Sequence, residues 1–255
     1  MKNTAWFFGD SFTFGDGCEK LQGGEYIKKF PDGILWTTEF ARHFNMNEKN
    51  MGINGGSNDT ILNTLITQMV NIKPNDIVIF GLSFPERFQL INKYTNSFMD
   101  YSPHVFFNPS RTDDTYKFDL KDGEYNNKLF ELIKQYITEF RIPHGEILQE
   151  YSKTQAESLL QILQRNGVTT FIWDIQSNAN AFESIDDIIN NGDAHWSWDG
   201  HHTWAVECIK LIEYKIQLND LTQQTQKMLE NIQSMETKYK VKHFEEWAIP
   251  KPKLI

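Results

Sequence analysis

Two short polar segments, one near each end of the chain, carry residue types that together perform nucleophilic catalysis. The first is Gly9-Asp10-Ser11, which directly follows an apolar run over 5–8. The second is Asp199-Gly200-His201-His202, in which an acid precedes a histidine by three residues. A serine hydroxyl attacks a carbonyl carbon only when a base takes its proton, and a histidine base needs an acid that orients it. The two segments supply one residue type for each of these roles.

Each segment also has an ordinary structural explanation. Gly-Asp-Ser is common in turns. Asp199 can cap a helix that starts near His201, which would leave His202 as a surface residue. The catalytic interpretation gains weight from position, because Ser11 follows the first predicted strand and the Asp-His pair precedes the last long helix. The carboxyl ends of parallel strands are where α/β proteins bind ligands.

The hydrophobic pattern alternates between strands and helices along most of the chain. Strands are predicted at 5–8, 49–53, 77–80 and 169–175, and helices at 34–44, 57–70, 125–140 and 147–164. Gly167 is predicted to end the last of these helices as a C-cap. This alternation indicates an α/β fold with a mostly parallel sheet. We predict a domain over residues 1–212 and a C-terminal helical arm and tail over 213–255.

With these two motifs the chain resembles the GDSL, or SGNH, hydrolase superfamily of serine esterases. The resemblance extends over residues 5–212, although the matching motifs are short. It implies a three-layer α/β/α sandwich with a flavodoxin-like sheet, in which Ser11 is the nucleophile, His202 the base and Asp199 its partner. The second block of the family is a glycine after the second strand. Gly55 fits it, and its N–H would bind the oxyanion together with that of Ser11.

The third block departs from the family pattern. The family has Gly-x-Asn after the third strand, whereas this chain has Gly81-Leu82-Ser83. A serine hydroxyl also donates one hydrogen bond, but its side chain is shorter than that of asparagine. Losing one oxyanion donor costs about 10²–10³ in turnover. Either Ser83 substitutes imperfectly, another donor such as Asn58 or Arg87 helps, or the activity is low.

Three residues are candidates for substrate binding: Asp10, Asn58 and Arg87. Arg87 follows the third strand closely, so it borders the expected site. It could bind an anionic group of a substrate, or it could pair with Glu86 or another acid, which is the favoured alternative.

An insertion over about 84–143 separates the third strand from the next helix of the minimal fold. Its residues 92–124 are irregular and rich in aromatic side chains. Long loops of this kind are often lids or binding loops. The same aromatic residues could instead pack the insertion onto the domain, and the sequence favours neither alternative.

Composition excludes several classes of protein and ligand. The formal net charge of −9 argues against nonspecific nucleic-acid binding. Two cysteines, Cys18 and Cys208, cannot form a disulfide framework or a zinc knuckle. No signal peptide or membrane span is visible, so we expect a cytoplasmic protein or one otherwise without a visible signal peptide. Asp193 and His195 lie near Asp199 in the sequence, and together they could form a metal site. The expected triad already accounts for Asp199 and His202, so no metal or other cofactor is expected.

The last predicted helix reaches about residue 242 without Gly or Pro. Apolar residues in it alternate spacings of three and four over about four heptads, at positions 211, 214, 218, 221, 228, 232, 235 and 239, with Thr225 between them. These residues form an apolar seam along the helix. The seam would either pack against the same seam of a second chain in a homo-oligomer, which is slightly favoured, or fold back onto the domain.

The predicted function is the hydrolysis of an acyl or acetyl ester, on a carbohydrate or another small substrate. Ser83 motivates a second hypothesis, a binding or structural protein that has kept the fold without efficient turnover. A third is acyl transfer to an acceptor other than water with the same residues.

Overall fold

The computed structural model describes residues 2–15, 21–22, 25–26, 35–92, 97–101, 127–174 and 198–243. The chain divides into two compact units, residues 1–209 and 210–255. In the described part of the chain, no helix combines the length and the apolar composition that crossing a bilayer requires.

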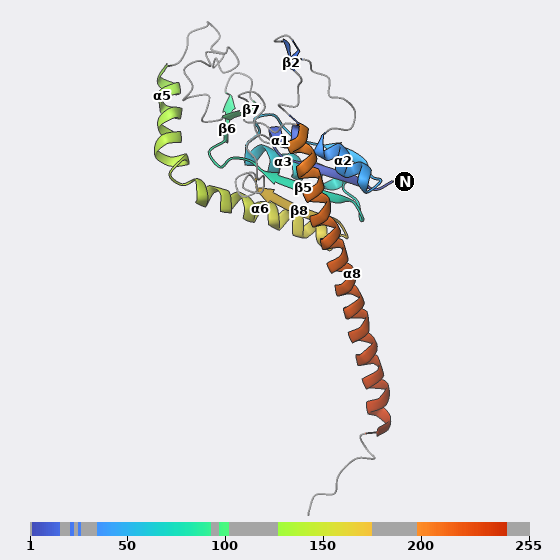
Figure 1. Ribbon diagram of the computed structural model, residues 1–255. Coiled ribbons are helices and arrows are strands. Elements are labelled where there is room, and N and C mark those ends of the chain that lie inside the picture. The colour runs from blue at the N-terminus through green and yellow to red at the C-terminus, as the bar shows by residue number, and fades with distance from the viewer. Residues whose placement is uncertain are drawn as a thin grey trace, which may run out of the picture. The chain divides into compact units, whose positions relative to one another are not determined.

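The first unit is built on a four-stranded parallel sheet with the order β4-β1-β5-β8 (Figure 1). These strands are β1 (Thr4–Phe8), β4 (Asn47–Asn50), β5 (Ile77–Leu82) and β8 (Thr169–Asp174). Numbered in chain order within this sheet, the strands follow the order 2-1-3-4 of flavodoxin-like folds. The predicted fold class is therefore confirmed.

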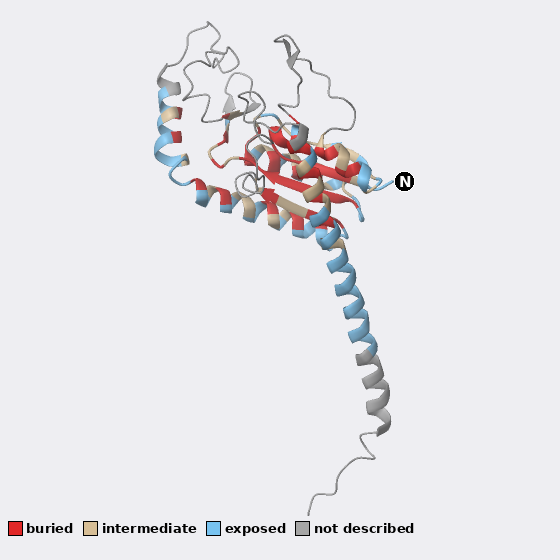
Figure 2. Cartoon of the chain, viewed as in Figure 1, coloured by how far each residue is buried: buried red, intermediate tan, exposed pale blue. Residues whose placement is uncertain are grey.

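Helices cover both faces of the sheet, because the side chains of its central strands alternate between two apolar layers. On one face Trp6 and Phe8 belong to a core that also includes Leu65 of α3 (Asn58–Gln68) and Leu160 of α6 (Gly145–Arg165). On the other face the Phe7 ring packs edge-on against side chains of α2 (Trp36–His43). Figure 2 shows the buried residues concentrated along the strands and on the inner sides of these helices.

The helix α8 (Trp198–His243) begins earlier than predicted, so Asp199, His201 and His202 lie within its first turns instead of on a turn before it. Its start is anchored by a cluster of three indole rings. Trp204 packs against Trp173 of β8 and Trp36 of α2, with ring centroids 4.9 Å and 6.4 Å apart. Such aromatic clusters contribute much of the energy of a core, and this one holds the histidine-bearing turns against the domain.

The insertion contains an antiparallel hairpin that the sequence did not indicate. It pairs β6 (Phe88–Asn92) with β7 (Ser97–Tyr101), and the rings of Phe88 and Tyr101 stack at 5.6 Å. Residues 102–126, which hold most of the aromatic loop, lie outside the described residues. The helix predicted at 125–140 is α5 (Asn127–Tyr136) followed by a π-helical turn, η3 (Ile137–Arg141).

Smaller differences concern element boundaries. The second strand of the sheet ends at Asn50, earlier than predicted, because the Asn50 side chain accepts the N–H of Gly52 and turns the chain. The helix α3 continues as the 3-10 helix η1 (Met69–Asn71). Two short paired strands, β2 (Leu21–Gln22) and β3 (Glu25–Tyr26), lie where a loop was expected. The C-cap of α6 is Asn166 rather than Gly167, which follows it with the positive φ of +80° that is common for a glycine just after a helix.

Candidate active site

Ser11 lies on a sharp turn between β1 and the four-residue helix α1 (Ser11–Phe14). Asp10 caps this helix, and its Oδ1 accepts the N–H of Phe12 at 3.1 Å. A Cβ on Gly9 would lie 2.1 Å from Oγ1 of Thr13, so only glycine permits a turn this tight. Ser11 is therefore placed at the carboxyl end of a buried strand, on rigid backbone, with only 1% of its surface exposed.

The glycine-bearing loop after β4 is fastened to α1. The N–H of Ile53 donates to the carbonyl of Gly9 at 2.9 Å, and Nδ2 of Asn50 donates to the carbonyl of Thr13 at 2.8 Å. A Cβ on Gly52 would lie 2.3 Å from the backbone nitrogen of Phe14, so the two backbones touch. The loop and the candidate nucleophile consequently form one rigid piece.

Gly55, the predicted oxyanion donor, lies beside open space in this loop. Its φ is +70°, and no atom of the described residues, apart from Gly55 and its two chain neighbours, lies within 4 Å of the position that a Cβ would take. Among the described residues its N–H has no hydrogen-bond acceptor, whereas the N–H of the next residue, Gly56, donates to the carbonyl of Ile53. An unpaired backbone N–H beside open space can accept a developing negative charge.

Ser83 is buried, and all of its polar atoms have partners. Its Oγ donates to Oδ2 of Asp10 and accepts from Nη1 of Arg87, both at 3.0 Å. Its backbone N–H and C=O bond to the amide of Asn58, at 2.7 Å and 3.2 Å. The single hydroxyl proton of Ser83 is therefore directed at a carboxylate in this arrangement.

Arg87 forms a buried ion pair with Asp10, with 2.9 Å between Nη1 and Oδ2 and side-chain exposures of 7% and 2%. Of the two alternatives for Arg87, the structure thus shows the ion pair, and the acid is Asp10 rather than its neighbour Glu86. The guanidinium also lies over the Phe84 ring, 5.0 Å from its centroid.

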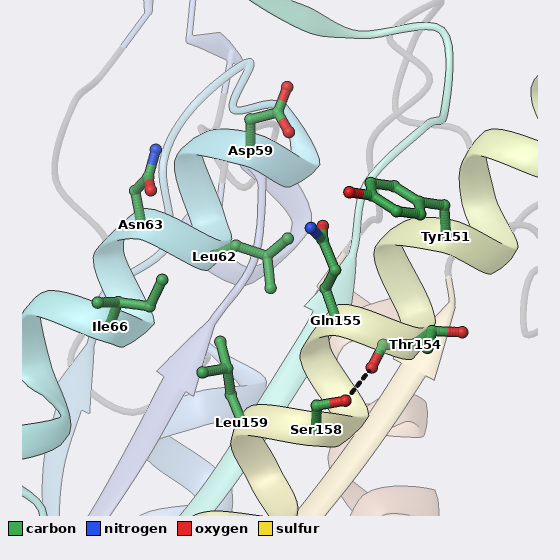
Figure 3. A pocket seen from close by; sticks show the side chains of 9 residues that line it. All are labelled: Asp59, Leu62, Asn63, Ile66, Tyr151, Thr154, Gln155, Ser158 and Leu159. Atoms are coloured by element: carbon green, nitrogen blue, oxygen red, sulfur yellow. Dashed lines mark hydrogen bonds between the residues drawn. The ribbon is translucent and has the colours of Figure 1, made fainter.

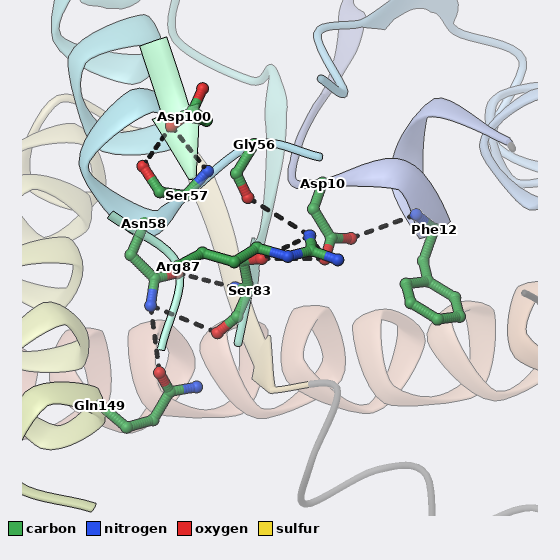
Figure 4. Close-up of polar contacts among 9 residues, drawn as sticks. All are labelled: Asp10, Phe12, Gly56, Ser57, Asn58, Ser83, Arg87, Asp100 and Gln149. Atoms are coloured by element: carbon green, nitrogen blue, oxygen red, sulfur yellow. Dashed lines mark hydrogen bonds and ion pairs between the residues drawn. The ribbon is translucent and has the colours of Figure 1, made fainter. Parts of the chain in front are cut away.

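Asn58 occupies the first position of α3 and is held on two sides. Besides its bonds to Ser83, its Nδ2 donates to Oε1 of Gln149 on α6 at 3.0 Å. Figure 4 shows how Asp10, Arg87, Ser83, Asn58 and Gln149 form one continuous chain of polar contacts. Asn58 therefore connects the site to the helical layer instead of presenting a free amide.

The two adjacent histidines of α8 face in different directions. His201 is fully buried, on the same stripe of the helix as Trp204 and Cys208. His202 has a side-chain exposure of 64%, and its Nδ1 lies 2.8 Å from Oε1 of Glu39 on α2. Among the described residues Glu39 is its only polar partner, so the structure does not bring His202 to Ser11. Asp199 belongs to α8, but its side chain lies outside what the structure describes.

Cys208 offers no competing nucleophile. It is buried on α8, and burial, together with the smaller effect of Glu207, raises the pKa of its thiol well above the usual range. A thiol protonated in this way is unreactive. Cys18 lies outside the described residues.

No group of three His, Cys, Asp or Glu side chains that could hold a metal is found in the described part of the chain. Asp193 and His195, which invited a metal interpretation, lie outside that part.

Sequence reasoning missed three polar residues of this region. Gln149 was hidden in a helical stretch with no motif around it. Asp100 accepts both the backbone N–H and the hydroxyl of Ser57, the N-cap of α3, from the hairpin that was itself missed. Glu39 carries the contact with His202. None of the three has a local signal, because each partner is at least 43 residues away.

A groove of about 410 Å³ lies elsewhere on the unit, between α3 and α6 (Figure 3). It is lined by Leu62 and Leu159 at its base and by polar side chains such as Asp59, Asn63 and Gln155. None of the residues predicted for the active site lines it.

Neither a protein-family model nor a curated protein sequence matches the chain. Among solved structures, it is similar to a member of the lipolytic G-D-S-L family from Veillonella parvula, with 14% identity and a TM-score of 0.35 over 81% of this chain and 96% of that one. It is also similar to an acetyl xylan esterase from Butyrivibrio proteoclasticus, with 12% identity and a TM-score of 0.42 over 84% of this chain and 64% of that one. A lipase/acylhydrolase from Enterococcus faecalis matches with 11% identity and a TM-score of 0.35 over 84% and 96% of the two chains.

Proposed function

We propose that the protein is a serine ester hydrolase with Ser11 as its nucleophile. The observation that carries this proposal is the joint placement of Ser11 and Gly55. Ser11 follows the turn after β1. The loop with Gly55, whose N–H has no acceptor among the described residues, is hydrogen-bonded to that turn and to α1. This arrangement offers a hydroxyl and an oxyanion donor on one rigid piece of backbone, as acyl transfer requires.

The proposed reaction has two steps. The Ser11 Oγ bonds to the ester carbonyl carbon while a histidine takes its proton, and the carbonyl π electrons move onto the oxygen, where backbone N–H groups of Ser11 and Gly55 stabilise the charge. Collapse expels the alcohol, which receives the proton from the histidine, and leaves an acyl-serine. Water then attacks this ester with the same histidine as base, releasing the acid and restoring Ser11.

His202 is the proposed base, because it alone of the two adjacent histidines has an acid, Asp199, three residues before it. This role requires the start of α8 to adopt an arrangement that brings the His202 imidazole from Glu39 to Ser11. Catalytic contacts are often formed only with substrate bound. His201 is the second candidate for the base, since it lies on the buried face of the helix.

The substrate we propose is a short acyl or acetyl ester of a carbohydrate or another small alcohol. A second candidate function is ligand binding with weak or no turnover. It is favoured by one observation, that the hydroxyl of Ser83 already donates to Asp10 and so offers no proton to an oxyanion.

A serine-directed fluorophosphonate distinguishes the two functions. A hydrolase should be labelled at Ser11 and at no other serine, as peptide mapping will show, and Ser11→Ala should remove both labelling and the hydrolysis of p-nitrophenyl acetate. Labelling that survives in the Ser11→Ala variant, or a wild-type chain that neither reacts nor hydrolyses, would eliminate the esterase proposal.

A further inference from the structure

The guanidinium of Arg87 is buried, yet only one of its three nitrogens has hydrogen-bond partners in the described part of the chain. Nη1 donates to Oδ2 of Asp10 at 2.9 Å, to Oγ of Ser83 at 3.0 Å and to the carbonyl of Gly56 at 3.4 Å. Nε is enclosed and has no partner among the described residues, whereas Nη2 is not one of the enclosed atoms without a partner. One N–H group of this buried side chain is thus left without an acceptor in the described part of the chain, and Nη2 lies beside it on the same edge.

Such an edge points to a ligand. Buried charged donors are costly to leave unpaired, and one that persists in a folded protein needs an explanation, such as a bound water, an ion or a ligand. The Nε of Arg141 is also enclosed without a partner in the described residues, but only Arg87 contacts the segments around Ser11. The Nε and Nη2 atoms of a guanidinium form its forked edge, which binds oxygens that carry negative charge. An acceptor that arrives only during the reaction would explain why the edge is unpaired in the free protein.

The position of the guanidinium identifies the acceptor. Its three partners come from the three segments expected to surround the oxyanion: Asp10 precedes Ser11, Gly56 follows Gly55, and Ser83 lies at the third block (Figure 4). The Ser83 hydroxyl cannot replace the missing asparagine while it donates its hydrogen bond to Asp10, and it also accepts a hydrogen bond from Arg87. The charged donor is hydrogen-bonded to the residue that stands where the family pattern has asparagine.

We propose that Arg87 is an oxyanion donor that takes over the role of the asparagine missing at Ser83. This inference rests on the proposed function, because it presupposes that Ser11 attacks a carbonyl. Asp10 holds the guanidinium in place through Nη1 and offsets its charge, and the remaining N–H groups are left for the oxygen that becomes negative. A guanidinium stays protonated at every working pH, and hydrogen bonds from a charged donor are about twice as strong as neutral ones.

The test compares Arg87→Ala with Arg141→Ala on p-nitrophenyl acetate. Arg141 is the matched control, because it lies over the Phe88 ring and donates to the carbonyls of Pro85 and Arg87, but does not contact Asp10 or Ser83. The substrate has no anionic group, so an arginine that only binds a substrate carboxylate would not affect it. We expect Arg87→Ala to lower kcat by about 10²–10³ with little change in KM, and Arg141→Ala to keep kcat within a few-fold.

Chemical rescue provides a second measurement. Millimolar guanidinium should restore part of kcat in Arg87→Ala, and should have no such effect in Ser11→Ala. If thermal melting shows that Arg87→Ala is unfolded, the double variant Asp10→Asn/Arg87→Met, which removes both buried charges, takes its place and should show the same loss of kcat.

Several outcomes would overturn the inference while leaving the esterase intact. These are an unchanged kcat in the folded Arg87 variant, an equal loss in Arg141→Ala, or an effect confined to the KM of esters that carry a carboxylate. A wild-type chain without hydrolysis and without labelling at Ser11 would instead be a failure of the proposed function.

Discussion

Asp10 and Arg87 are joined by a buried ion pair of 2.9 Å although they lie 77 residues apart in the sequence. The same carboxylate caps α1 with its other oxygen, by accepting the N–H of Phe12. The turn that presents Ser11 is therefore held directly by the segment that follows β5. Any substitution that disturbs this pair should therefore affect the stability of the domain.

Removing the acid of this pair should be strongly destabilising. Asp10→Ala leaves the Arg87 cation buried without its partner and removes the cap of α1. We expect a loss of about 3–5 kcal/mol in the free energy of unfolding from the unpaired charge, measured by urea denaturation. Asp10→Asn retains a good capping residue and should lose less. Equal losses in the two variants would show that the charge itself contributes little.

The two histidines of α8 can be separated by single substitutions. His202→Ala should be nearly inactive toward p-nitrophenyl acetate, and His201→Ala should retain most activity if it folds. A loss confined to His201→Ala would transfer the role of base to the buried residue. Because His201 lies in the core, thermal melting of both variants must accompany the kinetics.

The acid that orients the base is a separate question. Asp199→Asn should lower kcat, but by less than His202→Ala, because orientation matters less than proton transfer. Glu39→Gln should have almost no effect if the Glu39 contact belongs only to the resting arrangement. If Glu39→Gln is the more damaging variant, Glu39 is the partner of His202 in catalysis.

The chelator EDTA should leave the rate of ester hydrolysis unchanged, because the proposed reaction uses no metal.

Two substitutions measure what Ser83 contributes. Ser83→Ala should lower kcat with little change in KM, by about 10²-fold at most if the hydroxyl reaches the oxyanion. Since that hydroxyl donates to Asp10 in the structure, a loss of only a few-fold is the result expected if Arg87 is the donor. Ser83→Asn should raise kcat if the pocket has room for the amide. Measuring kcat for both variants shows whether the Ser83 hydroxyl or another group binds the oxyanion.

The loop after β4 allows a matched pair of glycine substitutions. Gly55→Ala meets no atom, so its cost should be the backbone strain of a positive φ alone, about 1–2 kcal/mol. Gly52→Ala would place a methyl group 2.3 Å from the Phe14 nitrogen and should displace the loop from α1. Thermal melting should show a far larger loss for Gly52→Ala. A similar loss in both would contradict the close approach of the two backbones.

The helical arm leads to a prediction about assembly. Leu218, Leu221 and Met228 are more than 40% exposed within the second unit, and an apolar seam of this kind favours association with a copy of itself. Deleting the chain from about residue 218 onward should lower the solution mass to that of a monomer, measured by light scattering, while Ser11 still reacts with the phosphonate. A full-length chain that is already monomeric at micromolar concentration would contradict the association.

The central strands and the position of Ser11 could be predicted from the sequence because their signals are local. Short apolar runs such as 5–8 and 77–80, rich in aromatic and β-branched residues, indicate buried strands, and their alternation with amphipathic helices indicates a parallel sheet. A serine directly after the first strand must then lie at the carboxyl edge of the sheet. The oxyanion role of Gly55 comes only from the resemblance of its loop to the second block of the family, and it stays a prediction.

Only the tertiary structure decided which polar side chains meet at that edge. The pairing of Asp10 with Arg87, and of Asn58 with Gln149, joins residues 77 and 91 positions apart, and no local pattern encodes such contacts. The direction of the two histidines depends on helix phase, since consecutive residues of a helix point about 100° apart. The helix α8 begins at Trp198, and the packing of Trp204 on Trp36 and Trp173 sets its rotation. That rotation, which arises from contacts among three distant indoles, buries His201 and exposes His202.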